Sequence, residues 1–122
     1  MILENLFESL PVGIIAFNNK EEIFDINNSG EKILGLNGNQ IKGKRWEELS
    51  LNSVKEDGTI FPYEEHPVVL ALRKKQEIHN VVMGVFNCHK KNHVWISINA
   101  VPGSCSKTDS SVFLTLTDVS NR

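Results

Sequence analysis

The feature that most constrains the fold of this chain is a two-residue alternation of apolar and other side chains in its last third. Residues 94–101 and 112–119 both alternate in this way. Successive side chains of a β-strand point to opposite faces of a sheet, so each segment predicts a strand with one buried face. The Val-rich segment 78–86 predicts a third strand, and the polar connections between the three are typical of an antiparallel meander. The buried face is expected to carry Val94, Ile96, Ile98, Val112, Leu114 and Leu116.

The first half of the chain predicts a β-hairpin followed by short helices. Residues 12–17 are apolar and rich in β-branched side chains, and residues 22–26 follow a polar turn, so the two segments predict a hairpin. Apolar residues spaced three and four apart predict a helix over 3–10. Further helices are expected over 30–34, 45–49 and 64–75. We therefore expect an α+β fold: a five-stranded antiparallel sheet with short helices on one face, and an N-terminal helix.

Local signals indicate where the helices begin and end. Asn28 and Glu31 have the spacing of a capping box, which predicts the start of the helix 30–34, and Gly35 is expected to end it. Pro67 must lie in the first turn of the helix 64–75, because a proline there removes no intrahelical hydrogen bond.

Length and composition predict one ordinary domain over residues 1–122, with the N-terminal helix in 1–11 and the core in 12–120. The chain is 40% hydrophobic and 23% charged. Its 13 basic and 15 acidic residues give a net charge of −2, which argues against binding to nucleic acid. No apolar run approaches the ~20 residues of a membrane span, so we expect no membrane contact. The presence of only two cysteines, Cys88 and Cys105, favours a cytoplasmic location.

No set of catalytic residues emerges from the sequence. It contains no P-loop, GxGxxG or HExxH motif and no nucleophile elbow. Cys88, His89 and His93 offer at most three ligands in a turn between two strands, one fewer than a structural zinc site uses. We therefore expect a protein that is not an enzyme and that holds no metal.

Several motifs, taken in order, resemble those of a known family. Residues 10–17 read Leu-Pro-Val-Gly-Ile-Ile-Ala-Phe, residues 25–28 read Asp-Ile-Asn-Asn and residues 31–35 read Glu-Lys-Ile-Leu-Gly. The segments 56–59 and 65–72, the strand 95–100 and the ending Thr-Asp-Val-Ser at 117–120 complete the set. In this order and over nearly the whole chain, the sequence resembles the PAS domains of bacterial and archaeal sensor proteins, such as histidine kinases and cyclic-dinucleotide signalling proteins.

The resemblance implies a sensory and dimerisation module rather than an enzyme. A small molecule or a partner would change the sheet, and the change would pass through Asp118 and the residues after it to an output domain in the full-length protein. The expected partners are a second copy of the chain, a small-molecule ligand and that output domain. Two alternatives stay open: a haem- or flavin-bearing redox or gas sensor, and a module that only binds other proteins.

The ligand of such a domain would lie between the sheet and the short helices. The side chains expected to line this pocket are Trp46, Phe61, Met83, Ile96, Ile98 and Leu114. The alternative for Trp46, Phe61 and Met83 is plain core packing, which we favour for each of them.

We expect no resident cofactor, although the sequence does not exclude haem or flavin. Some haem-binding PAS domains hold the iron through a histidine of the long helix, and His66 is the candidate here. Directly before Pro67, its ring is expected to cap the helix or to face solvent. The Asn-Cys-Arg-like motif of flavin-adduct LOV domains is absent, and neither cysteine is expected on a helix.

Two large aromatic residues, Trp95 and Phe113, share the face of the sheet opposite the apolar stripes. An exposed face with large aromatics close together is typical of a surface that another element covers. The N-terminal helix is too short to be stable alone, so it must dock on such a surface. We expect a homodimer or a helix-packing contact formed by Leu3, Leu6, Phe7, Trp95 and Phe113.

Overall fold

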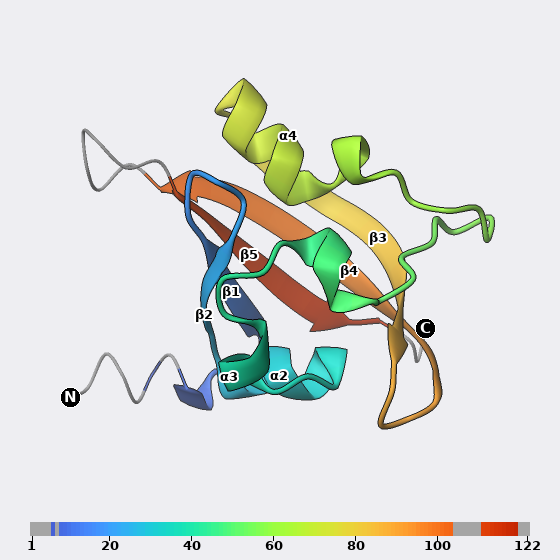
Figure 1. Cartoon of the computed structure of the whole chain (residues 1–122). Helices are drawn as coiled ribbons and strands as arrows, with labels where there is room; N and C mark the ends of the chain where they lie inside the picture. The colour runs from blue at the N-terminus through green and yellow to red at the C-terminus, as the bar shows by residue number, and fades with distance from the viewer. Residues whose placement is uncertain (1–5, 7, 104–110, 120–122) are drawn as a thin grey trace.

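The protein folds into one antiparallel sheet with its helices packed against one face (Figure 1). A computed structural model describes residues 6, 8–103 and 111–119. The sheet has five strands in the order β2-β1-β5-β4-β3. The strands are β1 (Gly13–Phe17), β2 (Ile23–Ile26), β3 (Ile78–Asn87), β4 (Asn92–Gly103) and β5 (Ser111–Asp118). The predicted hairpin, the meander and the α+β class are thus confirmed.

Between β2 and β3 the chain forms a series of short helices on that face (Figure 1). They are α2 (Asn28–Leu34), α3 (Gly38–Ile41), the 3₁₀ helices η1 (Trp46–Leu49) and η2 (Tyr63–Glu65), and α4 (Pro67–Lys74). The four-residue helix α3 was not predicted, because a single turn has too few residues for a periodic apolar pattern. It begins instead at an Asn37 cap, whose side chain accepts from the Asn39 N–H.

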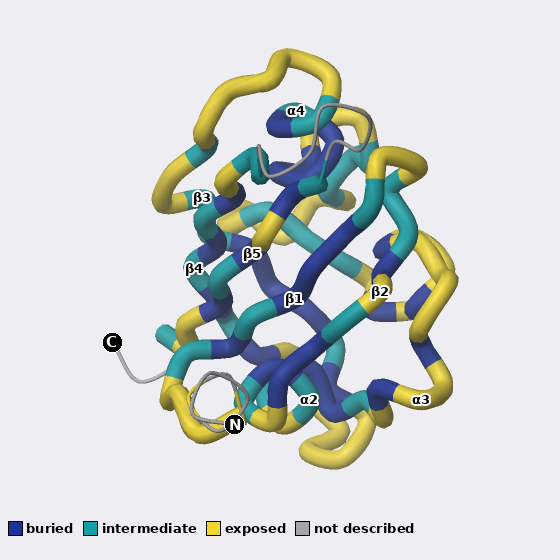
Figure 2. Tube along the Cα trace, turned by 90° about the vertical axis from the view of Figure 1, so that its left-hand side faces the viewer, coloured by how far each residue is buried: buried dark blue, intermediate teal, exposed yellow. Residues whose placement is uncertain are grey.

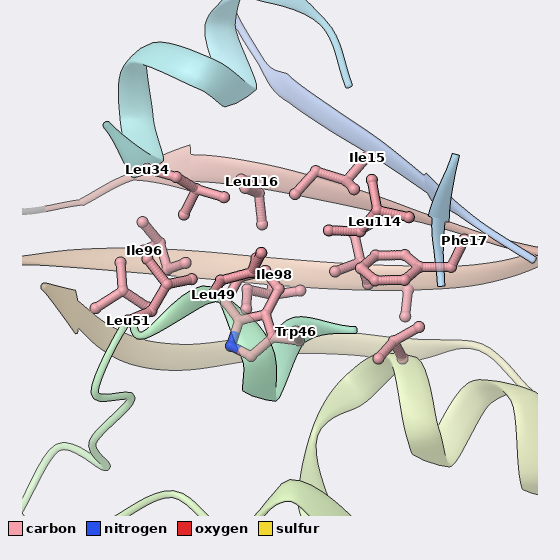
Figure 3. Packing of buried hydrophobic residues seen from close by; sticks show 14 of the residues in the cluster. Ile15, Phe17, Leu34, Trp46, Leu49, Leu51, Ile96, Ile98, Leu114 and Leu116 are labelled. Carbon is pink, nitrogen blue, oxygen red and sulfur yellow. The ribbon is translucent and has the colours of Figure 1, made fainter. Parts of the chain in front are cut away.

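Over residues 94–100 and 112–116 of the last two strands, every second side chain is buried in the core. Figure 3 shows strand side chains such as Ile98 and Leu114 gathered with Trp46 and Leu49 of η1 in one layer. The six residues predicted for the buried face are all buried. In Figure 2 the buried part of β1 runs through the middle of the molecule, while exposed residues gather in the connections. Burial of these aliphatic side chains supplies the main driving force for folding.

The outer face of the sheet carries Trp95 and Phe113, as predicted, but the two rings are not close to each other. Trp95 lies opposite Gly84, whereas Phe113 lies opposite Val101 and Ala16. Val101 is six residues beyond Trp95 on β4, so roughly 20 Å separates the two aromatic positions. The outer face therefore has two separate aromatic positions, and the expectation of a close pair was wrong.

The residue that caps the start of α2 lies one position earlier than predicted. Asn27, not Asn28, is the cap: its Oδ1 accepts from the N–H groups of Gly30 and Ile14. Glu31 does not complete a box, because its carboxylate accepts from the Gly38 N–H. The buried Asn27 thus joins α2 to β1, a tertiary contact that local spacing does not reveal.

Gly35 ends α2, as predicted, in the left-handed conformation with φ of 69°. The buried Asn87 at the end of β3 packs directly against it and donates from Nδ2 to the Ile33 carbonyl at 3.0 Å. A Cβ atom at Gly35 would lie 2.4 Å from the Asn87 Oδ1 atom. Glycine is required here both by the backbone conformation and by this close approach.

The long helix predicted over 64–75 is two elements. The chain makes the 3₁₀ turn η2, then becomes extended at His66 with φ of −63° and ψ of 139°, and α4 begins only at Pro67. A residue that precedes proline is disfavoured in the helical region, because the proline Cδ clashes with its backbone. Pro67 occupies the first helical position, as predicted.

Half of the helix expected over residues 3–10 lies outside the described residues, including Leu3 and Phe7. Of its apolar residues, Leu6 and Leu10 are described, and the Leu10 N–H donates to the Leu6 carbonyl at 3.1 Å. Leu6 is 51% exposed.

Candidate functional site

A cavity of about 320 Å³ lies between η1, the segment 50–54 and the chain that leads into α4. Most of its wall is apolar and much of it is aromatic, while the polar groups are few. The lining side chains are Trp46, Phe61, Tyr63 and His66; Leu51, Val54 and Ile60; and Glu47, Ser50, Asn52 and Ser53. A concave, mainly apolar site with a few polar groups is the usual form of a small-molecule site.

One wall of the cavity is fastened to the edge strand of the sheet. Val54 and Gly84 of β3 exchange two backbone hydrogen bonds of 2.9 Å, and the Phe86 N–H donates to the Leu51 carbonyl. Val54 also pairs with Ile60 across a short loop, so the chain turns back along the cavity. The side chain of Ile60 is 81% exposed at the rim.

His66 forms part of the wall and also starts α4. Its Nδ1 atom accepts a hydrogen bond of 3.0 Å from the Val68 N–H, which satisfies one of the free donors of the first helical turn. The ring is 1% exposed. The prediction that this ring caps the helix is confirmed, and the alternative that it faces solvent is wrong.

The same hydrogen bond decides the protonation of the ring. A nitrogen that accepts carries no proton, and a neutral imidazole then carries its proton on the other nitrogen. Burial lowers the pKa of His66 to about 3, so the ring is neutral at pH 7. The His66 Nε2–H is therefore a donor, and it is buried without a hydrogen-bond partner among the described residues. A buried donor of this kind costs free energy until an acceptor reaches it.

Three aromatic rings surround the imidazole. The ring centroids of Trp46, Phe61 and Tyr63 lie 4.5, 6.5 and 6.2 Å from that of His66. The Trp46 indole N–H donates to the Ser53 hydroxyl at 3.0 Å.

Tyr63 is held from the opposite side, by the turn between β1 and β2. Its hydroxyl donates to the Glu21 carboxylate at 3.1 Å. Burial and the neighbouring Glu21 charge raise the pKa of Tyr63, so the hydroxyl keeps its proton. Glu21 also forms an ion pair of 3.4 Å with Arg73 of α4. The side chains of Trp46 and Tyr63 are thus fixed by hydrogen bonds. The backbone N–H of Phe61 donates to the Ser53 carbonyl at 2.9 Å, but its ring is held by packing alone.

The structure divides the residues predicted for a ligand pocket into two groups. Trp46 and Phe61 line the cavity. Met83, Ile96, Ile98 and Leu114 are fully buried in the core and do not border it. The cavity lies beside the sheet edge rather than over the middle of the sheet. His66, which lines the cavity and caps α4, could be placed from the sequence, because a histidine directly before a proline is expected at the start of a helix.

The other predicted site residues lie apart from the cavity. Phe113 is 37% exposed on the outer face, and Trp95 is half-buried there. Asp118 ends β5, with its Oδ2 atom 4.0 Å from the Lys90 Nζ atom. The Val119 N–H then donates to the Trp95 carbonyl at 2.8 Å.

Haem does not fit His66 as the structure places it. Coordination of iron needs an imidazole nitrogen with an available lone pair. The Nδ1 lone pair already accepts from Val68, and Nε2 carries the proton. Iron ligation would therefore require the loss of the α4 cap.

The cysteine chemistry of a LOV domain has no counterpart at the cavity among the described residues. Cys88 is exposed in the turn after β3 and does not border the cavity, while Cys105 lies outside the described residues. In the part of the chain that the structure describes, no group of three or more His, Cys, Asp or Glu side chains could hold a metal ion. None of the described helices has the length and apolarity needed to cross a membrane.

Solved structures of PAS domains and of a LOV protein have the same fold. The PAS domain of nitrogen regulation protein NR(II) from Vibrio parahaemolyticus superposes with a TM-score of 0.73 at 8% identity, covering 98% of this chain and 99% of that one. The PAS domain of an HTR-like protein from Haloarcula marismortui gives 0.72 at 16% identity, covering 97% and 89%. The LOV protein of Rhodobacter sphaeroides gives 0.70 at 13% identity, covering 96% and 65%. At these identities the similarity shows the fold alone.

The sequence itself gives a family match. Comparison with curated proteins finds no match. The sequence model of the family described as PAS domain matches residues 1–65, more than half of the chain. Together with the strand order and the helices on one face of the sheet, this match shows that the chain belongs to the PAS domain family.

Proposed function

We propose that this chain is a non-catalytic sensory module that takes up a small molecule in the cavity beside β3 and passes the change to an output domain. The observation that carries the proposal is the His66 Nε2–H, a buried donor without a partner among the described residues, in the wall of an aromatic cavity. Buried polar groups in proteins are nearly always hydrogen-bonded, so an exception of this kind needs an explanation. An acceptor supplied by a ligand provides one.

A route from the cavity to the end of β5 supports the relay. Val54 in the cavity wall is bridged to Gly84, Gly84 lies opposite Trp95, and the Trp95 carbonyl accepts from the Val119 N–H. The contact is tight, because a Cβ atom at Gly84 would lie 2.8 Å from the Val54 Cγ2 atom and 3.0 Å from the Trp95 ring. A displacement of the wall would therefore reach the residues after Asp118, provided that the sheet has two arrangements which the ligand can bias.

The outer face of the sheet supports the homodimer that we propose for this module. Val101 and Phe113 face each other across β4 and β5, and each is 37% exposed. A second copy that covered this pair would remove apolar surface from water, and a stable contact buries on the order of 1,200–2,000 Å² in total.

The direct test is native mass spectrometry of the protein as purified, followed by a thermal-shift screen of small neutral compounds. We expect a co-purifying small molecule or a compound that raises the melting temperature, because a ligand that binds only the folded state stabilises it. A bare mass together with no stabilising compound in the screen would contradict ligand sensing. A His66→Phe variant, which keeps a ring but loses both nitrogens, is the matched control.

A further inference from the structure

The atoms around His66 indicate which chemical class of small molecule fits the cavity. This inference rests on the proposed function. The Val68 N–H donates to Nδ1, so the ring presents a donor at Nε2 and no acceptor. The group that satisfies Nε2 must therefore be an acceptor, such as a carbonyl, ether or hydroxyl oxygen. A ligand that offers only donors, or a metal ion, cannot pair with it.

The charges of the lining side chains further limit the class of ligand. Among the lining residues the structure records one carboxylate, Glu47, and no lysine or arginine. A carboxylate ligand would lose its hydration beside a neutral imidazole and gain no opposite charge in return. The Glu47 carboxylate is exposed to water, so it would hold a cationic ligand only weakly, and the cation would meet the positive end of the Nε2–H bond. An uncharged ligand avoids both costs.

The aromatic lining of the cavity favours a flat molecule. Trp46, Phe61 and Tyr63 are among the lining residues, and aromatic side chains pack favourably against planar groups. Nε2 is covered by its neighbours, so an oxygen atom reaches it only when a side chain of the wall turns aside. Of the three side chains near His66, only the ring of Phe61 makes no hydrogen bond, while those of Trp46 and Tyr63 are bonded to Ser53 and Glu21. Phe61 is therefore the ring that moves.

From these contacts we infer that the cavity takes an uncharged, planar molecule whose oxygen accepts a hydrogen bond from the His66 Nε2–H, and that Phe61 turns aside to admit it. The ligand then acts on α4 through the ring. An acceptor at Nε2 raises the electron density at Nδ1, and hydrogen bonds in such a chain strengthen one another. The cap on Val68 is therefore shorter and stronger in the bound state.

The test compares two probes that differ at a single non-hydrogen atom. Acetophenone carries a carbonyl oxygen, and α-methylstyrene has nearly the same shape with a methylene group in place of that oxygen. Titration of each into ¹⁵N-labelled protein, followed by amide spectra, gives both affinities. Loss of one hydrogen bond to a buried donor predicts about tenfold weaker binding of α-methylstyrene. Acetophenone is also expected to move the Val68 amide proton downfield, and α-methylstyrene is not.

The His66→Phe variant completes the comparison, because a phenyl ring replaces the imidazole and the Nε2–H donor is removed. We expect it to bind both probes with equal affinity. Equal affinities in the wild-type protein, with an unmoved Val68 amide, would overturn the inference and leave the binding cavity intact. Binding of neither probe at millimolar concentration would overturn both the inference and the proposed function. The wild-type comparison and the Val68 signal decide the matter even if the variant does not fold.

Discussion

The His66 Nδ1 atom accepts from the Val68 N–H at 3.0 Å, so one side chain both starts α4 and forms part of the wall of the cavity. The two roles use different nitrogens of the ring. Helix capping fixes Nδ1 as an acceptor, and this leaves the Nε2–H as a buried donor beside the cavity. The stability of α4 and the chemistry of the cavity are therefore linked in one residue, and substitutions can separate them.

Asparagine and alanine at position 66 separate the cap from the ring. Asparagine is among the best helix caps, so His66→Asn retains the hydrogen bond to Val68 while losing the ring. His66→Ala loses both, and we expect it to cost about 3 kcal/mol or more of unfolding free energy. The Asn variant should be about 1 kcal/mol more stable than the Ala variant by urea denaturation. An Ala variant as stable as the Asn variant would show that the cap contributes nothing.

Stability should fall as the pH is lowered from neutral. Burial lowers the pKa of His66 to about 3 in the folded protein, whereas a histidine of the unfolded chain has its ordinary pKa of 6.5. Between these values the unfolded state binds the extra proton, so the stability from this residue is complete above pH 6.5 and is lost toward pH 3. From pH 7 to pH 5 the loss is about 2 kcal/mol.

Urea denaturation at several pH values in this range measures that loss. The His66→Asn variant is the control, since it should lack this part of the pH dependence while keeping every other titrating group. Asp57, whose pKa is lowered by the side-chain and backbone hydrogen bonds with Thr59, titrates below the range. If the unfolding free energies of the wild-type protein and the variant depend on pH in the same way, the imidazole of His66 is not a buried neutral group.

The order of elements was predictable from the sequence because it depends on periodic patterns several residues long. The alternation in β4 and β5 placed Ile96 and Leu114 in the core, and both are fully buried. Gly35 and Pro67 also have the local roles predicted for them, since each acts through its own backbone geometry. The PAS family followed from the order of several such motifs.

Features that depend on tertiary contact were not predictable from spacing. Asn27 rather than Asn28 caps α2, because only Asn27 also reaches β1. The helix predicted from residue 64 breaks at His66, where proline restricts the backbone. The cavity lies beside Val54 at the edge of β3, and its position depends on how a long irregular segment packs. That segment has no periodic apolar pattern from which its packing could be predicted.

Alanine at Gly35 tests the contact between α2 and β3. The left-handed conformation costs a side chain roughly 1–2 kcal/mol, and the new Cβ atom would also collide with Asn87. Gly43 is a matched control, because its φ of 85° is also positive but no atom would lie within 4 Å of its Cβ atom. We expect Gly35→Ala to be the more destabilising by at least about 1 kcal/mol in urea denaturation. Equal losses in the two variants would contradict the contact.

Gly84→Ala tests the attachment of the cavity wall to the sheet. The added methyl group would lie 2.8 Å from the Val54 Cγ2 atom, so we expect a loss of about 1–3 kcal/mol and displacement of the wall. Combining the substitution with Val54→Ala removes the clash with Val54 but not the 3.0 Å approach to the Trp95 ring. The double variant should therefore recover part of the loss and be more stable than the sum of the two single losses predicts. Additive losses in denaturation experiments would show that the two residues do not press on each other.

Charge on the outer face tests the proposed homodimer. Phe113→Glu places a carboxylate beside Val101 on an apolar patch, so self-association should weaken by at least tenfold in sedimentation experiments at tens of micromolar protein. Ile60→Glu is the control, since Ile60 is more exposed and lies at the cavity rim rather than on the outer face. A wild-type protein that sediments as a monomer would rule the homodimer out. A Phe113→Glu variant that still dimerises fully would show that the contact lies elsewhere.

The most direct test of the account is to observe the protons of the His66 ring. Long-range ¹H–¹⁵N correlation spectra of the ¹⁵N-labelled protein distinguish a protonated ring nitrogen from one that only accepts. We expect a neutral ring from pH 7 down to pH 5, with the proton on Nε2 and none on Nδ1. A proton on Nδ1, or a charged ring at pH 7, would contradict this expectation, because the cavity would then lack the buried neutral Nε2–H donor that the proposed ligand requires.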